Sequence, residues 1–212
     1  MNPHEKFSAA LKHLPLVGIL RGITPADAQA IALKLTSLNW RLIEVPLNSP
    51  QPLQSIEIMV QACPDALVGA GTVLSAEDVR NVHAAGGQLI VSPNFNAVVV
   101  GEAQRLGMVC LPGVMTATEA FAALQAGASG LKLFPAEMIT PAVVKALRAV
   151  LPAHSLLMPV GGITPDNMQV YRAAGADGFG IGSALYKPGQ RATEVGANAE
   201  RFMTAWAGTL SA

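Results

Sequence analysis

Two ionisable residues lie inside short apolar runs. Lys132 lies in residues 131–134 (LKLF), and Glu44 lies in residues 42–46 (LIEVP). If both runs are barrel strands, alternation points these two side chains into the lumen and their neighbours toward the helices. Burial lowers the pKa of a lysine, which exposes the amine lone pair for attack on a carbonyl. The pattern is compatible with a nucleophilic lysine. A structural ion pair, or a register that points Lys132 to solvent, would also explain it.

Glu44 is the natural partner of Lys132 if both point into one lumen. It could serve only as a counter-ion. It could also be a general acid and base whose pKa is raised by burial. Both roles can hold at different steps of one reaction.

Glycines after the last two apolar runs indicate a phosphate site. The pair at 161–162 precedes a helix start at Thr164, and residues 182–183 (GS) precede a short helical stretch. Backbone amides at helix N-termini bind phosphate, and barrels often build that site after strands seven and eight. Tight packing is the alternative reason for these glycines. Residues 178–182 (GFGIG) lack G-x-G-x-x-G spacing, so we expect no nicotinamide cofactor.

Eight apolar runs recur at intervals of 20 to 26 residues, each interval long enough for one helix and two loops. The runs are 16–21, 41–46, 67–72, 88–92, 108–111, 130–134, 156–160 and 178–182. They predict a single (β/α)8 barrel domain over residues 1–212 with an N-terminal helix, and a doubly wound open sheet is the alternative. In either fold the active site lies at the carboxyl ends of the strands. The residues at those ends are Arg21, Asn48, Thr72, Pro93, Gly161, Gly162, Gly182 and Ser183.

Capping signals predict where helices begin. A hydroxyl residue precedes a proline at Thr24-Pro25, Ser49-Pro50, Thr140-Pro141 and Thr164-Pro165. Ser75 with Asp78 and Thr116 with Glu119 have capping-box spacing. We assign these residues no chemistry.

The composition excludes several classes of protein. Hydrophobic residues make up 51% of the 212 residues, which excludes disorder, and 14 basic residues balance 14 acidic ones. Nucleic acid and anionic membranes therefore have no bulk charge in their favour as partners. Apolar runs are too short to span a membrane, no signal peptide is evident, and two cysteines indicate a reducing cytoplasm. The low charge suggests that other subunits cover some surface.

The four histidines predict no metal site. His4 and His13 are expected in the N-terminal helix, His83 in a later helix and His154 in a loop before the seventh strand. None is expected at a catalytic strand end, and their spacing matches no metal-ligand motif.

Five segments together resemble a known family. They are 43–50 (IEVPLNSP), 69–74 (GAGTVL), 112–114 (PGV), 131–135 (LKLFP) and 161–163 (GGI), in order and at the right intervals. This set closely resembles the 2-keto-3-deoxy-6-phosphogluconate/6-phosphogalactonate aldolases over nearly the whole chain. The resemblance implies a homotrimeric class I aldolase on a (β/α)8 barrel, and we expect no cofactor. It assigns the Schiff-base lysine to Lys132 and the acid/base glutamate to Glu44.

The details resemble the galactonate branch of that family. Gluconate-type members usually have an arginine in the loop where this chain has Asn48, so the substrate carboxylate is expected at Arg21 and Thr72. They also tend to have a threonine where this chain has Val160. Residues 20–22 (LRG) and 46–49 (PLNS) match the galactonate type. The expected substrate-binding set is Arg21, Asn48, Thr72, Pro93, Phe134, Val160, Gly161, Gly162, Gly182 and Ser183.

The resemblance implies cleavage of 2-dehydro-3-deoxy-6-phosphogalactonate to pyruvate and D-glyceraldehyde 3-phosphate. The gluconate epimer as main substrate is one alternative. A phosphosugar isomerase or epimerase and a non-catalytic phosphosugar-binding barrel are the others, and neither needs a lysine in the lumen.

Overall fold

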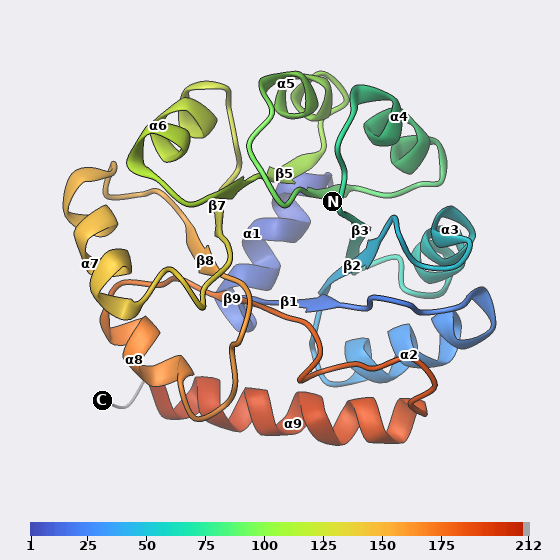
Figure 1. The fold of residues 1–212 in the computed structure, drawn as a ribbon. Coiled ribbons are helices and arrows are strands. Elements are labelled where there is room, and N and C mark those ends of the chain that lie inside the picture. The colour runs from blue at the N-terminus through green and yellow to red at the C-terminus, as the bar shows by residue number, and fades with distance from the viewer. Residues whose placement is uncertain (210–212) are drawn as a thin grey trace.

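The computed structural model describes residues 1–209, which form a ring of parallel strands surrounded by helices (Figure 1). The strands are β1 (Leu16–Ile19), β2 (Leu42–Pro46), β3 (Leu67–Gly71), β4 (Leu89–Val91), β5 (Val109–Leu111), β6 (Gly113–Val114), β7 (Leu131–Leu133), β8 (Leu157–Pro159) and β9 (Phe179–Ile181). The helices are α1 (Pro3–His13), α2 (Pro25–Ser37), α3 (Pro52–Ala62), α4 (Ala76–Ala84), α5 (Ala97–Arg105), α6 (Ala117–Gln125), α7 (Pro141–Val150), α8 (Met168–Ala173) and α9 (Ala192–Thr209).

The strands close into a barrel with eight strand positions. Parallel pairing gives the orders β5-β4-β3-β2-β1-β9 and β6-β7-β8, and a bridge between Val160 and Gly180 joins β8 to β9. A single residue, Pro112, separates β5 from β6. The strand is interrupted there because a proline has no N–H to continue the ladder of hydrogen bonds. The predicted (β/α)8 barrel is confirmed, and the open sheet is excluded. The fifth strand, predicted as one run, is divided in two.

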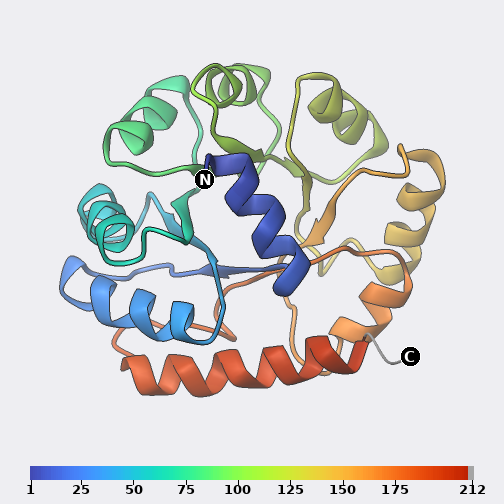
Figure 2. The ribbon, with the colours of Figure 1, turned by 180° about the vertical axis from the view of Figure 1, so that it is seen from behind.

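An additional helix closes the amino end of the barrel. Helix α1 lies across the ring in Figure 2. It confirms the predicted N-terminal helix and contains His4 and His13, as expected. Its Phe7 and Ala10 pack against residues that fill the lumen, among them Leu42 and Met158. The opposite end, where the strands finish, is left open for a site.

A second, larger core lies between the strands and the outer helices. Ile43, Val45, Leu131 and Leu133 all belong to it. Their positions confirm the predicted alternation, which turns the residues between them, on β2 and β7, toward the lumen.

Four of the six predicted helix starts are correct. Both capping boxes form, at Ser75 and Thr116, and α2 and α7 begin at the predicted prolines. The starts at Ser49-Pro50 and Thr164-Pro165 are wrong, because α3 begins at Pro52 and α8 at Met168. The Ser49 hydroxyl instead accepts a hydrogen bond from the Gly22 N–H, 2.9 Å away, and so ties two loops together.

Within residues 1–209, no helix is both long and apolar enough to cross a membrane. The predicted domain limits of 1–212 extend beyond the described residues and stay a prediction.

Candidate active site

A cavity of about 490 Å³ opens at the carboxyl ends of the strands. All the residues predicted for the site line it except Asn48. They are Lys132, Glu44, Arg21, Thr72, Pro93, Phe134, Val160, Gly161, Gly162, Gly182 and Ser183. The cavity thus brings residues that are far apart in the sequence, from Arg21 to Ser183, to one end of the barrel.

Lys132 projects from β7 into this cavity and is 7% exposed. Its Nζ lies 4.7 Å from the centroid of the Phe134 ring, two residues along the chain. Burial lowers the pKa of Lys132, the nearby Glu44 charge opposes that shift, and the Arg21 charge adds to it. The amine is therefore easier to deprotonate than an ordinary lysine, which a nucleophile requires.

Glu44 projects from β2 and is 2% exposed. Burial raises its pKa, while the positive charges of Lys132 and Arg21 pull the value down. Its Oε2 has no hydrogen-bond partner among the described residues, and no ion pair joins it to Lys132 there. The two groups line one cavity, and the charge of each shifts the pKa of the other. Because no direct ion pair holds them, each can exchange protons with a substrate.

The Glu44 carboxylate occupies space that the absence of a side chain at Gly71 leaves open. A Cβ at Gly71, at the end of the neighbouring strand β3, would lie 2.3 Å from Glu44 Oε1 and 2.8 Å from Cδ. Only glycine leaves room for the carboxylate at this place.

Arg21 and Thr72 lie in the loops after β1 and β3, at the mouth of the cavity. The Arg21 Nη1 donates a hydrogen bond to Asn48 Oδ1 at 2.6 Å, so Asn48 contacts the arginine rather than the cavity. Thr72 has a φ of 57°, a left-handed conformation that is unfavourable for a β-branched residue and typical of functional sites. The Arg21 guanidinium and the Thr72 hydroxyl are both hydrogen-bond donors, the kind of group that binds an anion.

The glycine end of the cavity is built by the loops after β8 and β9. Gly161 and Gly162 have φ values of 109° and 60°, which few other residues tolerate. A Cβ at Gly182 would meet nothing within 4 Å, so the cavity is open there. These loops leave backbone groups accessible to a ligand, as a phosphate site needs.

Pro93, Phe134 and Val160 form the apolar part of the lining. Val160 is 8% exposed, and its Cγ2 would lie 2.7 Å from a Cβ at Gly180, so Val160 packs closely on that glycine. The side chain at position 160 is thus held at the cavity wall.

Sequence reasoning missed two charged residues of the lining, Glu137 and Lys187. The Oε2 of Glu137 would lie 2.4 Å from a Cβ at Gly161, so its carboxylate lies against the glycine pair. Both residues lie in loops that directly follow predicted strands, at the third position after Phe134 and the fourth after Ser183. Their place in loops that directly follow strands is the signal that the sequence carries for them.

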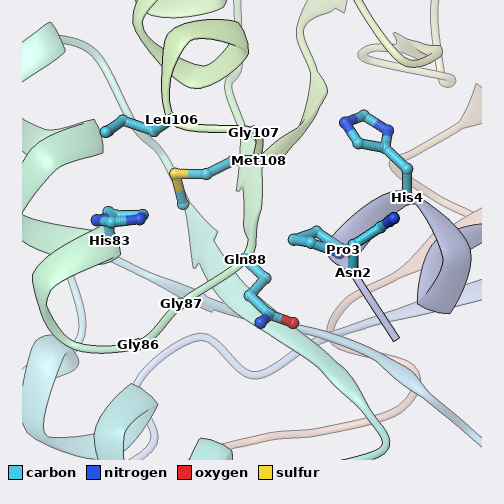
Figure 3. A pocket seen from close by; sticks show the side chains of 10 residues that line it. All are labelled: Asn2, Pro3, His4, His83, Gly86, Gly87, Gln88, Leu106, Gly107 and Met108. Carbon is cyan, nitrogen blue, oxygen red and sulfur yellow. The ribbon is translucent and has the colours of Figure 1, made fainter.

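A second hollow, of about 550 Å³, lies near α1 at the amino ends of β4 and β5 (Figure 3). Figure 3 shows His4 and His83 on opposite sides of it. No group of three or more His, Cys, Asp or Glu that could bind a metal occurs among residues 1–209. Barrel enzymes place their chemistry at the other end, so we assign this hollow no reaction.

Comparison with known proteins identifies relatives over nearly the whole chain. The model of the family described as KDPG and KHG aldolase matches residues 7–196. The probable 2-dehydro-3-deoxy-6-phosphogalactonate aldolase of Rhizobium meliloti (strain 1021) is 47% identical over 85% of this chain and 86% of its own. The 2-dehydro-3-deoxy-6-phosphogalactonate aldolase of Escherichia coli (strain K12) is 46% identical over 91% of this chain and 95% of its own. A solved structure described as native KDPGal matches with a TM-score of 0.92 and 45% identity, over 94% of this chain and 97% of that chain.

Proposed function

The chain belongs to the KDPG and KHG aldolase family, and from this premise we propose that it is a class I aldolase that cleaves 2-dehydro-3-deoxy-6-phosphogalactonate. The products are pyruvate and D-glyceraldehyde 3-phosphate. The observation that carries the proposal is the buried Lys132, with a lowered pKa, in one cavity with the buried Glu44, whose pKa is raised.

Lys132 forms the covalent intermediate. Its neutral amine attacks the C2 ketone of the substrate, and water leaves as the iminium forms. The iminium withdraws electrons, so the electron pair of the C3–C4 bond can move toward it when that bond breaks. The lowered pKa of Lys132 keeps a larger share of the amine ready for attack.

Glu44 moves the protons. It protonates the departing hydroxyl during iminium formation, and then accepts the proton of the C4 hydroxyl, through a water molecule. The C3–C4 bond breaks and glyceraldehyde 3-phosphate leaves. Glu44 returns a proton to C3 of the enamine, and hydrolysis of the resulting iminium releases pyruvate. A raised pKa suits a carboxyl group that must both give and take protons near neutral pH.

The rest of the lining orients the substrate. Pro93 and Phe134 pack against the pyruvyl end, and Arg21 and Thr72 bind its carboxylate, with Asn48 holding Arg21 by their 2.6 Å hydrogen bond. The phosphate is held at the other end of the cavity by Gly161, Gly162, Gly182 and Ser183.

Val160 supports the galactonate epimer as the substrate. The gluconate and galactonate substrates differ only at C4, beside the bond that breaks. A valine wall offers no hydrogen bond that would favour the gluconate configuration. Coupled assays of pyruvate release from each pure epimer test this, and a preference of ~100-fold or more for the gluconate epimer would overturn the galactonate assignment.

No metal or organic cofactor enters these steps. Activity should therefore survive prolonged treatment with EDTA. A loss of activity that zinc or magnesium restores would move the protein to a metal-dependent class.

We also propose a cytoplasmic homotrimer, in which an apolar surface at α5 and α6 contacts a second copy. Leu74, Val98, Met115 and Phe121 are 53, 66, 39 and 46% exposed. The Asn96 side chain links Leu74 to the start of α5, because its Nδ2 donates to the Leu74 carbonyl and its Oδ1 accepts from the Val98 N–H. Contact with a second copy would remove the apolar surface of these side chains from water.

Val98→Asp tests this surface by light scattering after gel filtration. The native chain should elute as a trimer and the variant as a smaller species. Val170→Asp, a matched change on α8 at a residue that is 54% exposed, should leave the trimer intact. A trimer that tolerates Val98→Asp as well as Val170→Asp would place the contact elsewhere.

A further inference from the structure

The phosphate end of the cavity has an unbalanced charge. Its backbone groups are neutral, and the carboxylate of Glu137 lies against Gly161 and Gly162. A phosphate ester that binds there brings further negative charge beside that carboxylate. Without a cation nearby, Coulomb repulsion in the partly enclosed cavity would oppose binding.

Two of the three cations of the lining are engaged at other places. Lys132 lies in the lumen beside the ring of Phe134. Arg21 is held by Asn48 at the loops after β1 and β2. Lys187, on the same loop as Gly182 and Ser183, is the remaining cation.

The loop that carries Lys187 is well fixed. The Lys187 N–H donates to Gln190 Oε1 at 2.8 Å, and the Gln190 N–H donates to the Lys187 carbonyl at 3.1 Å. The adjacent Pro188 packs on Gly22, where a Cβ would lie 2.6 Å from the proline Cγ. Among residues 1–209, the ammonium group of Lys187 has no hydrogen bond or ion pair. The backbone is therefore held in place while the charged end stays available for a ligand.

We propose that Lys187 is a specificity residue that supplies the positive charge for the substrate phosphate in the cavity that Glu137 also lines. The inference rests on the proposed function and deepens it. The glycine loops give the phosphate its hydrogen bonds, and Lys187 offsets the repulsion from Glu137. An aldehyde or sugar acid without the phosphate gains nothing from this charge.

Steady-state kinetics of Lys187→Met with two substrates test the proposal. The substrates are 2-dehydro-3-deoxy-6-phosphogalactonate and its unphosphorylated counterpart. We expect KM for the phosphorylated substrate to rise about tenfold with little change in kcat, since one charged contact is lost. KM for the unphosphorylated substrate should stay the same. Lys187→Arg should restore most of the affinity.

Two controls separate this effect from a general one. Lys145→Met removes a lysine from the exposed face of α7, outside the cavity, and should change neither KM. Added salt should raise KM of the native enzyme for the phosphorylated substrate more than that of Lys187→Met, because salt screens the charge. Equal losses for both substrates, or an unchanged KM, would overturn the proposal.

Failure of the proposed function is distinguishable from failure of this inference. If the native chain releases no pyruvate from either substrate, the aldolase proposal fails. Binding of inorganic phosphate, followed by phosphorus NMR line broadening, then tests Lys187 directly. Weaker binding by Lys187→Met than by Lys145→Met supports its role, and equal binding overturns it.

Discussion

Substitution of Gly71 by alanine should displace the Glu44 carboxylate without changing any of its atoms. The new Cβ would lie 2.3 Å from Glu44 Oε1, whereas ordinary contacts are 3.4 Å or longer. Gly71 is the last residue of β3 and pairs with Pro46 of β2, so the backbone is held by the sheet. The carboxylate must therefore move, by about 1 Å.

A displacement of that size has a large kinetic effect. Misplacement of a reacting group by ~1 Å can lower the rate ~10²-fold. We expect Gly71→Ala to reduce kcat for pyruvate release by about that factor, measured with a coupled assay at saturating substrate. Circular dichroism at the assay temperature establishes that the variant is folded.

Gly101→Ala is the matched control. Gly101 lies within α5, where a Cβ would meet nothing within 4 Å. This change should leave kcat unaltered and stabilise the helix by ~0.5–1 kcal/mol. If Gly71→Ala is folded and has a normal kcat, the carboxylate is free to move, and the argument that packing positions it is refuted.

Four other changes test separate parts of the account. Glu44→Gln should lower turnover ~10²–10⁴-fold, the typical contribution of one acid/base group, and near-normal turnover would reduce Glu44 to a counter-ion. Lys132→Met should keep or raise the melting temperature at neutral pH, provided that Glu44 takes up a proton and is not left an unpaired buried charge. The reason is that burial lowers the pKa of this amine in the folded state, so protonation of the amine destabilises the folded protein. The native protein therefore has its full stability only above pH 10.5, and it loses stability as the pH falls through the lower folded-state pKa. The gain should shrink toward pH 10.5, and a gain independent of pH would contradict this. Ser183→Asp should raise KM for the phosphorylated substrate much more than for the unphosphorylated one, and equal losses would place the phosphate elsewhere. Val160→Thr should shift the ratio of specificity constants toward the gluconate epimer roughly tenfold, as assays of both epimers can measure.

The spacing of apolar runs was enough to predict the barrel. Each run is buried on both faces, so its continuous apolar residues predict a strand and not a loop. The regular intervals between the runs leave room for one helix each. The break at Pro112 was not predicted, although a proline inside a strand removes a ladder hydrogen bond. Two helix starts were wrong because Ser49 and Thr164 belong to loops, where side chains such as Ser49 bond other loops instead of capping helices.

The candidate site was predictable where residues broke the apolar pattern. Lys132 and Glu44 are conspicuous because charge is costly in a strand. The surroundings that tune them depend on packing across the barrel, such as the close approach of Gly71 to Glu44, and no local pattern reveals such contacts. Glu137 and Lys187 were missed because charged residues are ordinary in loops, and only the closed barrel brings these loops to one cavity.

Borohydride reduction in the presence of pyruvate, followed by peptide mass spectrometry, tests the central claim most directly. We expect one reduced pyruvyl adduct per chain, on Lys132, and no adduct in Lys132→Met. An isomerase, an epimerase or a non-catalytic binding protein would gain no adduct. An adduct that persists in Lys132→Met, or that maps to another lysine in the native chain, would contradict the account.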